Sequence, residues 1–255
     1  MNGVLLYKKE DAERNRWFIQ KLICELSLRG VSATLALAED DLARLPDFAI
    51  VRSIMPERNA ELEHRGVRVF NNAATARVAC DKWESYLLCK RLGLAHLQTA
   101  LSDKELAFPL VVKARRGHGG TEVFWSENAS ESAQYGKEYL FQAPCDTLGI
   151  DTRVYAVGGK VVAAVKRTAK SGFKSNFSLG GSVALCSVTK EQKEAVERLY
   201  EALRFDYLGV DFLPHNGGWV VNELEDAAGA RMLYSVSDID IASIYAEHIS
   251  RELKK

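Results

Sequence analysis

Apolar and polar positions in the first part of the chain alternate between the repeat of a strand and the repeat of a helix. Short apolar runs predict strands at Val4–Tyr7, Val31–Leu37, Phe48–Val51 and Val67–Phe70. After the first strand comes a predicted helix that ends at Gly30, with apolar residues at helical spacing: Ile19, Leu22, Ile23 and Leu26. Because strands that alternate with helices form parallel sheets, we expect residues 1–72 to be a small α/β domain.

After residue 72 the pattern changes to strands that follow one another with few helices between them. One helix is predicted, closed by Gly93, from the apolar positions Ala79, Trp83, Tyr86 and Leu87. Strand signals then follow at Leu110–Ala114, Thr121–Trp125, Leu140–Gln142, Thr152–Val157, Lys160–Lys166, Leu208–Leu213 and Trp219–Glu223. Gly158-Gly159 is typical of a two-residue hairpin turn.

Two later helices complete the predicted elements. Thr189 and Gln192 form a capping box at the start of the first helix. The second carries four residues on one side, namely Ile241, Ile244, Tyr245 and His248. Antiparallel strands with helices packed on them make residues 73–255 an α+β unit, distinct from the beginning of the chain.

Composition argues against some classes of function. The 255 residues are 47% apolar and 27% charged, with 34 basic and 34 acidic side chains. The balance removes the main electrostatic argument for nucleic-acid binding, which needs a basic excess. Neither a signal peptide nor an apolar run of membrane-spanning length is recognisable, and the five cysteines are widely spaced, so we expect a cytoplasmic protein with reduced thiols.

Three carboxylates gather late in the chain: Asp211, Glu223 and Glu225. Asp211 and Glu223 lie in neighbouring predicted strands across a short turn, and residues 223 and 225 share a strand face. Oxygen ligands of this kind suit Mg²⁺. A solvated acidic strand end is an equally good explanation of the periodicity alone. The apolar residues around these acids favour the metal site, because a buried carboxylate needs a partner.

A lysine stands directly before a glycine-rich turn. Lys113 ends an apolar strand, and residues 115–120 read Arg-Arg-Gly-His-Gly-Gly. An ammonium beside exposed backbone N–H groups suits phosphate binding. An ordinary loop is the alternative, with His118 as a bystander. The segment is neither a P-loop nor a dinucleotide fingerprint.

From Asn71 onward the chain resembles the ATP-grasp superfamily and, within it, the RimK-like glutamate ligases. The motifs that carry this resemblance stand in the family's order. They are Asn71-Asn72 with Asp81-Lys82, Phe108–Lys113 with the glycine turn, Gln142-Ala143-Pro144, Asp151–Lys160, Arg167 with Phe173–Asn176 and Gly180-Gly181, and Gly209–Asp211 with Asn222–Glu225.

The resemblance implies a fold and a set of roles. It implies an α/β leading domain, residues 1–72, followed by an α+β ATP-grasp fold whose two lobes clasp ATP, at about 80–145 and about 146–255. The residues that it implies for nucleotide binding are Lys82, Lys113, Gly117, Gly119, Gly120, Gln142, Ala143 and Asp151. It implies Mg²⁺, with Mn²⁺ as an alternative, on Asp211, Glu223 and Glu225, and stabilisation of the reacting groups by Arg167, Lys174 and Asn176.

The activity implied is an ATP-dependent carboxylate–amine ligase that works through an acyl phosphate and releases ADP and phosphate. The expected substrates are small-molecule or peptide acids and amines, with a protein or precursor peptide as a further type of acceptor, and the protein is expected to be a homodimer. An ATP-grasp kinase and a nucleotide-binding regulatory protein are the alternatives. Three positions depart from the family pattern: Glu225 replaces Asn, Lys174 replaces Arg, and Ala228 replaces Pro, and the last two leave open whether the acid is glutamate.

Overall fold

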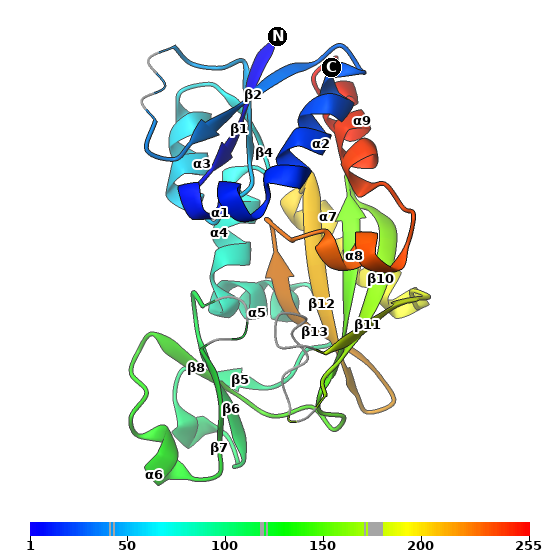
Figure 1. The fold of residues 1–255 in the computed structure, drawn as a ribbon. Coiled ribbons are helices and arrows are strands. Elements are labelled where there is room, and N and C mark those ends of the chain that lie inside the picture. The colour runs from blue at the N-terminus through cyan, green and yellow to red at the C-terminus, as the bar shows by residue number, and fades with distance from the viewer. Residues whose placement is uncertain (41, 43, 118–119, 121, 171, 173–180) are drawn as a thin grey trace.

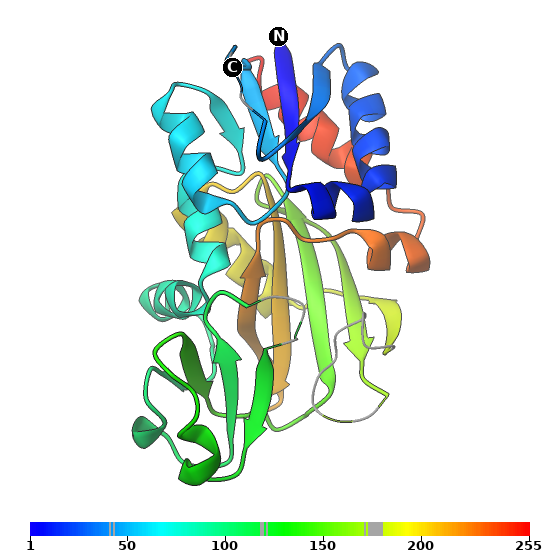
Figure 2. The ribbon, with the colours of Figure 1, turned by 60° about the vertical axis from the view of Figure 1, so that its left-hand side comes forward.

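The described part of the chain folds around three β-sheets (Figure 1). The structure is a computed structural model that describes residues 1–40, 42, 44–117, 120, 122–170, 172 and 181–255. The N-terminal sheet lies at one end, a five-stranded sheet occupies the middle, and a small four-stranded sheet lies at the other end (Figures 1 and 2). Among the described residues, no helix is long and apolar enough to cross a membrane.

The N-terminal sheet is parallel throughout, as predicted. Its strand order is β2-β1-β3-β4, with β1 at Asn2–Tyr7, β2 at Ser32–Leu37, β3 at Phe48–Val51 and β4 at Arg68–Phe70. Helices α1 (Lys9–Arg14), α2 (Arg16–Ser27) and α3 (Pro56–His64) belong to the same part of the chain. Sequence reasoning missed α3, because only Asn59 and Leu62 of this polar helix are buried.

The middle sheet is antiparallel, with the order β11-β10-β9-β12-β13. Its strands are β9 (Ile150–Val157), β10 (Lys160–Thr168), β11 (Ser182–Cys186), β12 (Tyr207–His215) and β13 (Gly218–Glu225). The predicted hairpin at Gly158-Gly159 is confirmed, since Val157 pairs with Lys160. Helices α7 (Lys190–Leu203), α8 (Arg231–Val236) and α9 (Ile241–Glu252) accompany this sheet, and α7 begins with the predicted capping box.

The small sheet is also antiparallel, with the order β5-β8-β6-β7. It consists of β5 (Thr99–Ala100), β6 (Leu110–Ala114), β7 (Val123–Ser126) and β8 (Tyr139–Gln142), with the short helices η1 (Asp103–Glu105) and α6 (Ala129–Ser132) beside it. Strands β6 and β7 pair on either side of the glycine-rich turn, so the predicted hairpin is confirmed.

The helix predicted through Ala79 and Leu87 is in fact two helices, α4 (Ala73–Cys80) and α5 (Lys82–Arg91). The break falls at Asp81, whose backbone is extended and whose Oδ1 accepts the N–H of Trp83 at 2.9 Å, which caps α5. The single-helix prediction was wrong because it rested on apolar spacing, which gives no sign of the break at Asp81, whose carboxylate is buried against Arg115.

One apolar core joins the N-terminal sheet to the middle sheet. Leu5 and Phe48 of the first sheet belong to the same buried cluster as Tyr155, Tyr207 and Tyr245. Helix α9 at the end of the chain lies beside α2 near its beginning (Figure 1). The shared core holds the first sheet in a defined position over the C-terminal strands.

Candidate active site

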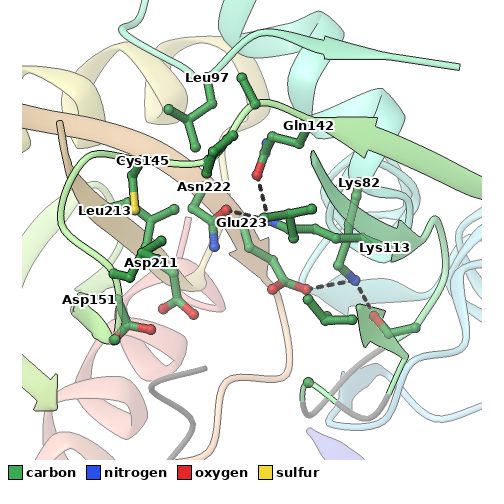
Figure 3. A pocket seen from close by; sticks show the side chains of 18 of the residues that line it. Lys82, Leu97, Lys113, Gln142, Cys145, Asp151, Asp211, Leu213, Asn222 and Glu223 are labelled. Atoms are coloured by element: carbon green, nitrogen blue, oxygen red, sulfur yellow. Dashed lines mark hydrogen bonds and ion pairs between the residues drawn. The ribbon is translucent and has the colours of Figure 1, made fainter. Parts of the chain in front are cut away.

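A cleft lies between the small sheet and the middle sheet. Figure 3 shows polar side chains from both sheets pointing into it. Most of the residues that the sequence singled out line this cleft: Lys82, Lys113, Gly117, Gly120, Gln142, Ala143, Asp151, Arg167, Asp211 and Glu223. The predicted residues Gly119, Lys174 and Asn176, like His118, lie outside the described part of the chain.

Lys113 is buried at the base of the cleft and is held by two amides (Figure 3). Its Nζ donates to Oε1 of Gln142 at 2.6 Å and to Oδ1 of Asn222 at 2.7 Å. Gln142 is itself oriented by Thr99, whose Oγ1 accepts from Nε2 at 3.0 Å. Burial lowers the pKa of Lys113 to about 8, because the charged form is poorly solvated there. A buried ammonium group at the base of the cleft favours an anionic ligand.

Lys82 enters the same cleft from the first residue of α5. Its Nζ lies 2.9 Å from Oε1 of Glu223 and also donates to the carbonyl of Gly117 at the start of the glycine-rich turn. Because Asp81 caps α5 and Lys82 is the first residue of that helix, the cap positions this lysine. A Cβ at Gly117 would approach Oε2 of Glu122 to 2.9 Å, a contact that the flexible glutamate side chain can relieve by moving.

The three predicted metal ligands come together on β12 and β13. Asp211 faces Glu223 directly across the two strands, and Glu225 lies two residues further along β13. One ligand oxygen from each of the three lies within 4.8 Å of the others. Three carboxylate oxygens at this spacing fit a hard divalent cation such as Mg²⁺.

Two buried arginines hold these acids. Arg153 on β9 faces Asp211 on β12, and its Nε and Nη2 each lie 2.7 Å from an oxygen of that carboxylate. Nη2 of Arg153 also donates to Oε1 of Glu225 at 2.5 Å. Arg167 bonds both Asp151 and Asp211, with Nη2 at 2.6 Å from Oδ2 of Asp211.

The pKa values of the acids in this network are shifted in different directions. Burial opposes ionisation of Asp211, but Arg153 and Arg167 outweigh it and hold the pKa of that carboxyl well below its usual range. Among the described residues Glu225 accepts a hydrogen bond from Arg153, and burial raises its pKa above the ordinary value. Asp211 is therefore the permanently charged member of the cluster.

Sequence reasoning named Asp151 and Arg167 but missed Arg153 and Asn222. Both residues lie inside motifs of the family resemblance, Asp151–Lys160 and Asn222–Glu225. The available signal for Arg153 was its alternation with Asp151 on one strand, which places both side chains on the same face. Its contact with Asp211 depended on β9 pairing with β12, which the sequence does not reveal.

A second cleft opens where the N-terminal sheet meets the middle sheet. Gly117, Arg167 and Glu223 line both clefts, so the two spaces meet at the acids and arginines. The second cleft also carries residues of the N-terminal part, including Lys8, Arg14 and Arg52, together with Glu225 and Asp226. Burial raises the pKa of Asp226 to about 7.

The arrangement suits the handling of a bound polyanion. Two lysines, a glycine-rich turn and three carboxylates for a divalent cation lie together, and Arg153 and Arg167 border the route to the second cleft. Cys145 points into the first cleft, but burial raises the pKa of its thiol, which argues against a thiolate nucleophile.

Comparison with known proteins agrees with this geometry. The family model described as "RimK-like ATP-grasp domain" matches residues 88–249. An uncharacterised protein of Mycoplasma genitalium is 28% identical over 267 residues, covering 99% of this chain and 93% of that protein. A probable alpha-L-glutamate ligase of Histophilus somni is 29% identical over 241 residues, covering 83% of this chain and 79% of the relative.

Solved structures share the fold over almost the whole chain. The D-cycloserine synthetase DcsG superposes with a TM-score of 0.75 at 17% identity, covering 98% of this chain and 99% of that one. The ATP-grasp ligase PsnB, in complex with a phosphomimetic precursor variant, Mg and ADP, gives a TM-score of 0.69 at 16% identity and covers 99% of this chain and 98% of its own. At these identities the likeness shows a shared fold.

Proposed function

Because the chain belongs to the family of RimK-like ATP-grasp domains, we propose that its two connected clefts activate a carboxylate with Mg·ATP and couple it to an amine. The protein is an ATP-grasp ligase, and its reaction forms an amide bond at the expense of ATP. The assignment of roles to residues rests on one observation: Glu223, Gly117 and Arg167 line both clefts. A phosphoryl group in the first cleft would thereby face an acid in the second.

The first cleft supplies contacts for each part of a nucleotide. Gln142 and Ala143 lie where β8 ends and would border the adenine. Lys82, Lys113 and the backbone of the glycine-rich turn at Gly117 and Gly120 would bind the phosphates. Asp151 would act on the same cleft through Arg167, whose guanidinium it holds.

Asp211, Glu223 and Glu225 would hold the divalent cation, as Mg²⁺ or, with the same oxygen ligands, Mn²⁺. When bound, the cation would neutralise phosphate charge next to the transferring group. Lys82 already contacts Glu223, so the ammonium and the cation would act on neighbouring phosphate oxygens.

Arg167 would stabilise the charge that develops during transfer of the phosphoryl group to the acid and during attack by the amine. Arg153 fixes Asp211 and Glu225 in place and thereby orients two of the three ligands. The sequence adds Lys174 and Asn176 to this set through the family motif. No side chain needs to form a covalent intermediate, because positioning and electrostatic stabilisation suffice for phosphoryl transfer.

The second cleft would take the acid and the amine. Its mixed lining of basic and acidic residues suits small zwitterions or peptide ends. Relatives named as glutamate ligases make L-glutamate the first substrate to try, and the precursor-bound PsnB structure makes peptide acceptors the second. A homodimer is the proposed assembly.

The experiment that tests this function uses hydroxylamine to intercept the activated acid. Purified protein would be incubated with Mg·ATP, a pool of amino and dicarboxylic acids, and hydroxylamine. A hydroxamate from the wild type, lost in Glu223→Gln and retained in Glu105→Gln, would establish acyl activation and identify the acid by mass. The control residue Glu105 is exposed and lies outside both clefts.

The other outcomes separate the alternatives. Phosphate transfer to a substrate without hydroxamate would indicate a kinase. ATP binding without hydrolysis in the presence of every acid would contradict the ligase and favour a regulatory nucleotide-binding protein.

A further inference from the structure

Asp226, a carboxylate of the second cleft, differs from the neighbouring acids in its bonding. It follows β13 directly, is only 5% exposed and lines the cleft together with Glu225. Asp211 and Glu225 are bonded to Arg153, and Glu223 to Lys82. Within the described ranges, no lysine or arginine side chain donates a hydrogen bond to the Asp226 carboxylate.

Arg52, whose charge acts on Asp226, donates its hydrogen bonds to the backbone. Arg52 donates to the carbonyl of Ala228 at 2.8 Å and, over 3.4 Å, to the carbonyl of Asp226. Its guanidinium lies 4.4 Å from the ring centroid of Tyr207, which keeps it in this position. Arg52 therefore fastens the turn and acts on the Asp226 carboxylate through its charge, with no hydrogen bond to it among the described residues.

A second side chain from the N-terminal part supports the same turn. Nδ2 of Asn71 donates to the carbonyl of Tyr207 at 2.5 Å and lies 3.4 Å from the carbonyl of Asp226. The backbone that carries Asp226 is thus held from two directions by buried groups. Its carboxylate has a defined place beside the acids of β13 and does not need a substrate to order it.

A buried carboxylate gains further stability from a cation in direct contact with it, and the cleft leaves room for one to come with the substrate. The acyl group would be activated where the two clefts meet, so the amine must reach it from the second cleft. At neutral pH a primary amine arrives as an ammonium ion.

We propose that Asp226 binds the ammonium group of the incoming amine substrate and so selects a cationic primary amine as the acceptor. This inference rests on the proposed ligase function and names the residue that recognises its second substrate. Amino acids and peptides with an unblocked amino group belong to the acceptor class that it defines. Neutral acceptors such as alcohols and amides do not.

The first test measures binding and needs no turnover. Glycinamide and L-glutamate, both of which carry an α-ammonium group, would be titrated into the full-length protein with Mg²⁺ and a non-hydrolysable ATP analogue, with ligand-observed NMR as the readout. Loss of one charge-assisted hydrogen bond in Asp226→Asn should weaken binding about ten- to hundredfold. Asp226→Ser should do the same, whereas Glu13→Gln, a change to an exposed acid outside the cleft, should have no effect.

Equal affinities in the wild type and both Asp226 variants would overturn the proposal, as would failure of the wild type to bind either amine. Thermal unfolding of each variant verifies that it is folded. If one Asp226 variant unfolds at a lower temperature than the wild type, the binding result for the other Asp226 variant decides the test.

The second test separates acid activation from amine recognition. Hydroxylamine is uncharged at pH 8, so Asp226→Asn should form hydroxamate at a rate within about threefold of the wild type. Glycinamide added to the same reaction should compete with hydroxylamine in the wild type and about tenfold less effectively in the variant. Loss of hydroxamate in Asp226→Asn would assign the residue to acid activation and overturn the proposal.

The two tests also distinguish the proposal from the function on which it rests. If the wild type gives no hydroxamate, the proposed function fails, and the binding titration alone decides the role of Asp226.

Discussion

Arg153 and Asp211 face each other on β9 and β12 and are joined by two hydrogen bonds of 2.7 Å each. The guanidinium also reaches Glu225, so one buried arginine holds two of the three acids proposed for the cation. Because both side chains are buried, moving either one away would leave the charge of the other buried without this partner. The geometry of the proposed metal site thus depends on an arginine of a third strand.

We expect Arg153→Met to be strongly destabilising. Removal of one partner leaves the carboxylate of Asp211 buried with less compensation, which typically costs about 3–5 kcal/mol of unfolding free energy. Chemical denaturation measures the change. Arg65→Met is the matched control, because Arg65 pairs with the exposed Glu61 and should cost less than about 1 kcal/mol. Similar losses in both variants would contradict this view.

Lys113 should make the ligand-free protein more stable as the pH rises. Its pKa is about 8 in the folded protein and near 10.5 when exposed, so the unfolded chain binds more protons between these values. Stability should therefore increase from pH 8 towards 10.5 relative to Lys113→Met, by an amount on the order of 3 kcal/mol. The measurement is denaturation of both proteins across this range, and parallel curves would refute the assignment.

Lys113→Met should also weaken nucleotide binding. The variant removes the cation at the base of the cleft while the amides of Gln142 and Asn222 stay. We expect the affinity for Mg·ATP to fall about tenfold or more, measured by calorimetry. Lys104→Met changes an exposed lysine of η1 and should leave the affinity unaltered.

Removal of the divalent cation should affect the wild type and Glu223→Gln differently. With chelator present, the acids of β12 and β13 repel the nucleotide phosphates, so the wild type should bind ADP much more weakly without Mg²⁺ than with it. In Glu223→Gln the difference between the ADP affinities with and without Mg²⁺ should be smaller. The variant lacks one carboxylate that would bind Mg²⁺ and that repels the phosphates when Mg²⁺ is absent. Calorimetric titration of ADP with and without Mg²⁺ tests this, and an unchanged difference would argue against Glu223 as a ligand.

Asp81→Ala should act on Lys82 through the start of α5. The carboxylate caps this helix and pairs with Arg115 at 2.7 Å. Loss of the cap should cost about 0.5–2 kcal/mol, and the lysine at the first helical position should bind phosphate less well. Denaturation and the KM for ATP report the two effects. A stability loss without any change in KM would show that the cap does not position Lys82.

Local patterns accounted for most of the fold. The parallel strands of the N-terminal sheet, the hairpin at Gly158-Gly159 and the capping box at Thr189 and Gln192 were all predictable, because each depends on residues near one another in the chain. The split between α4 and α5 was missed, since Asp81 is buried by Arg115, more than thirty positions away. Apolar spacing carries no information about such a partner.

The candidate site, like the fold, was predictable in part from local patterns in the sequence. The order of motifs pointed to Lys82, Lys113, Asp211 and Glu223, and alternation along β13 placed Glu223 and Glu225 on one face, because these signals depend on residue type and spacing. The ion pair between Arg153 and Asp211 and the burial of Asp226 were decided only by the tertiary structure. They require β9 to pair with β12 and Arg52 to reach the turn after β13, and such long-range contacts follow from sheet order and packing, which no local pattern of residues encodes.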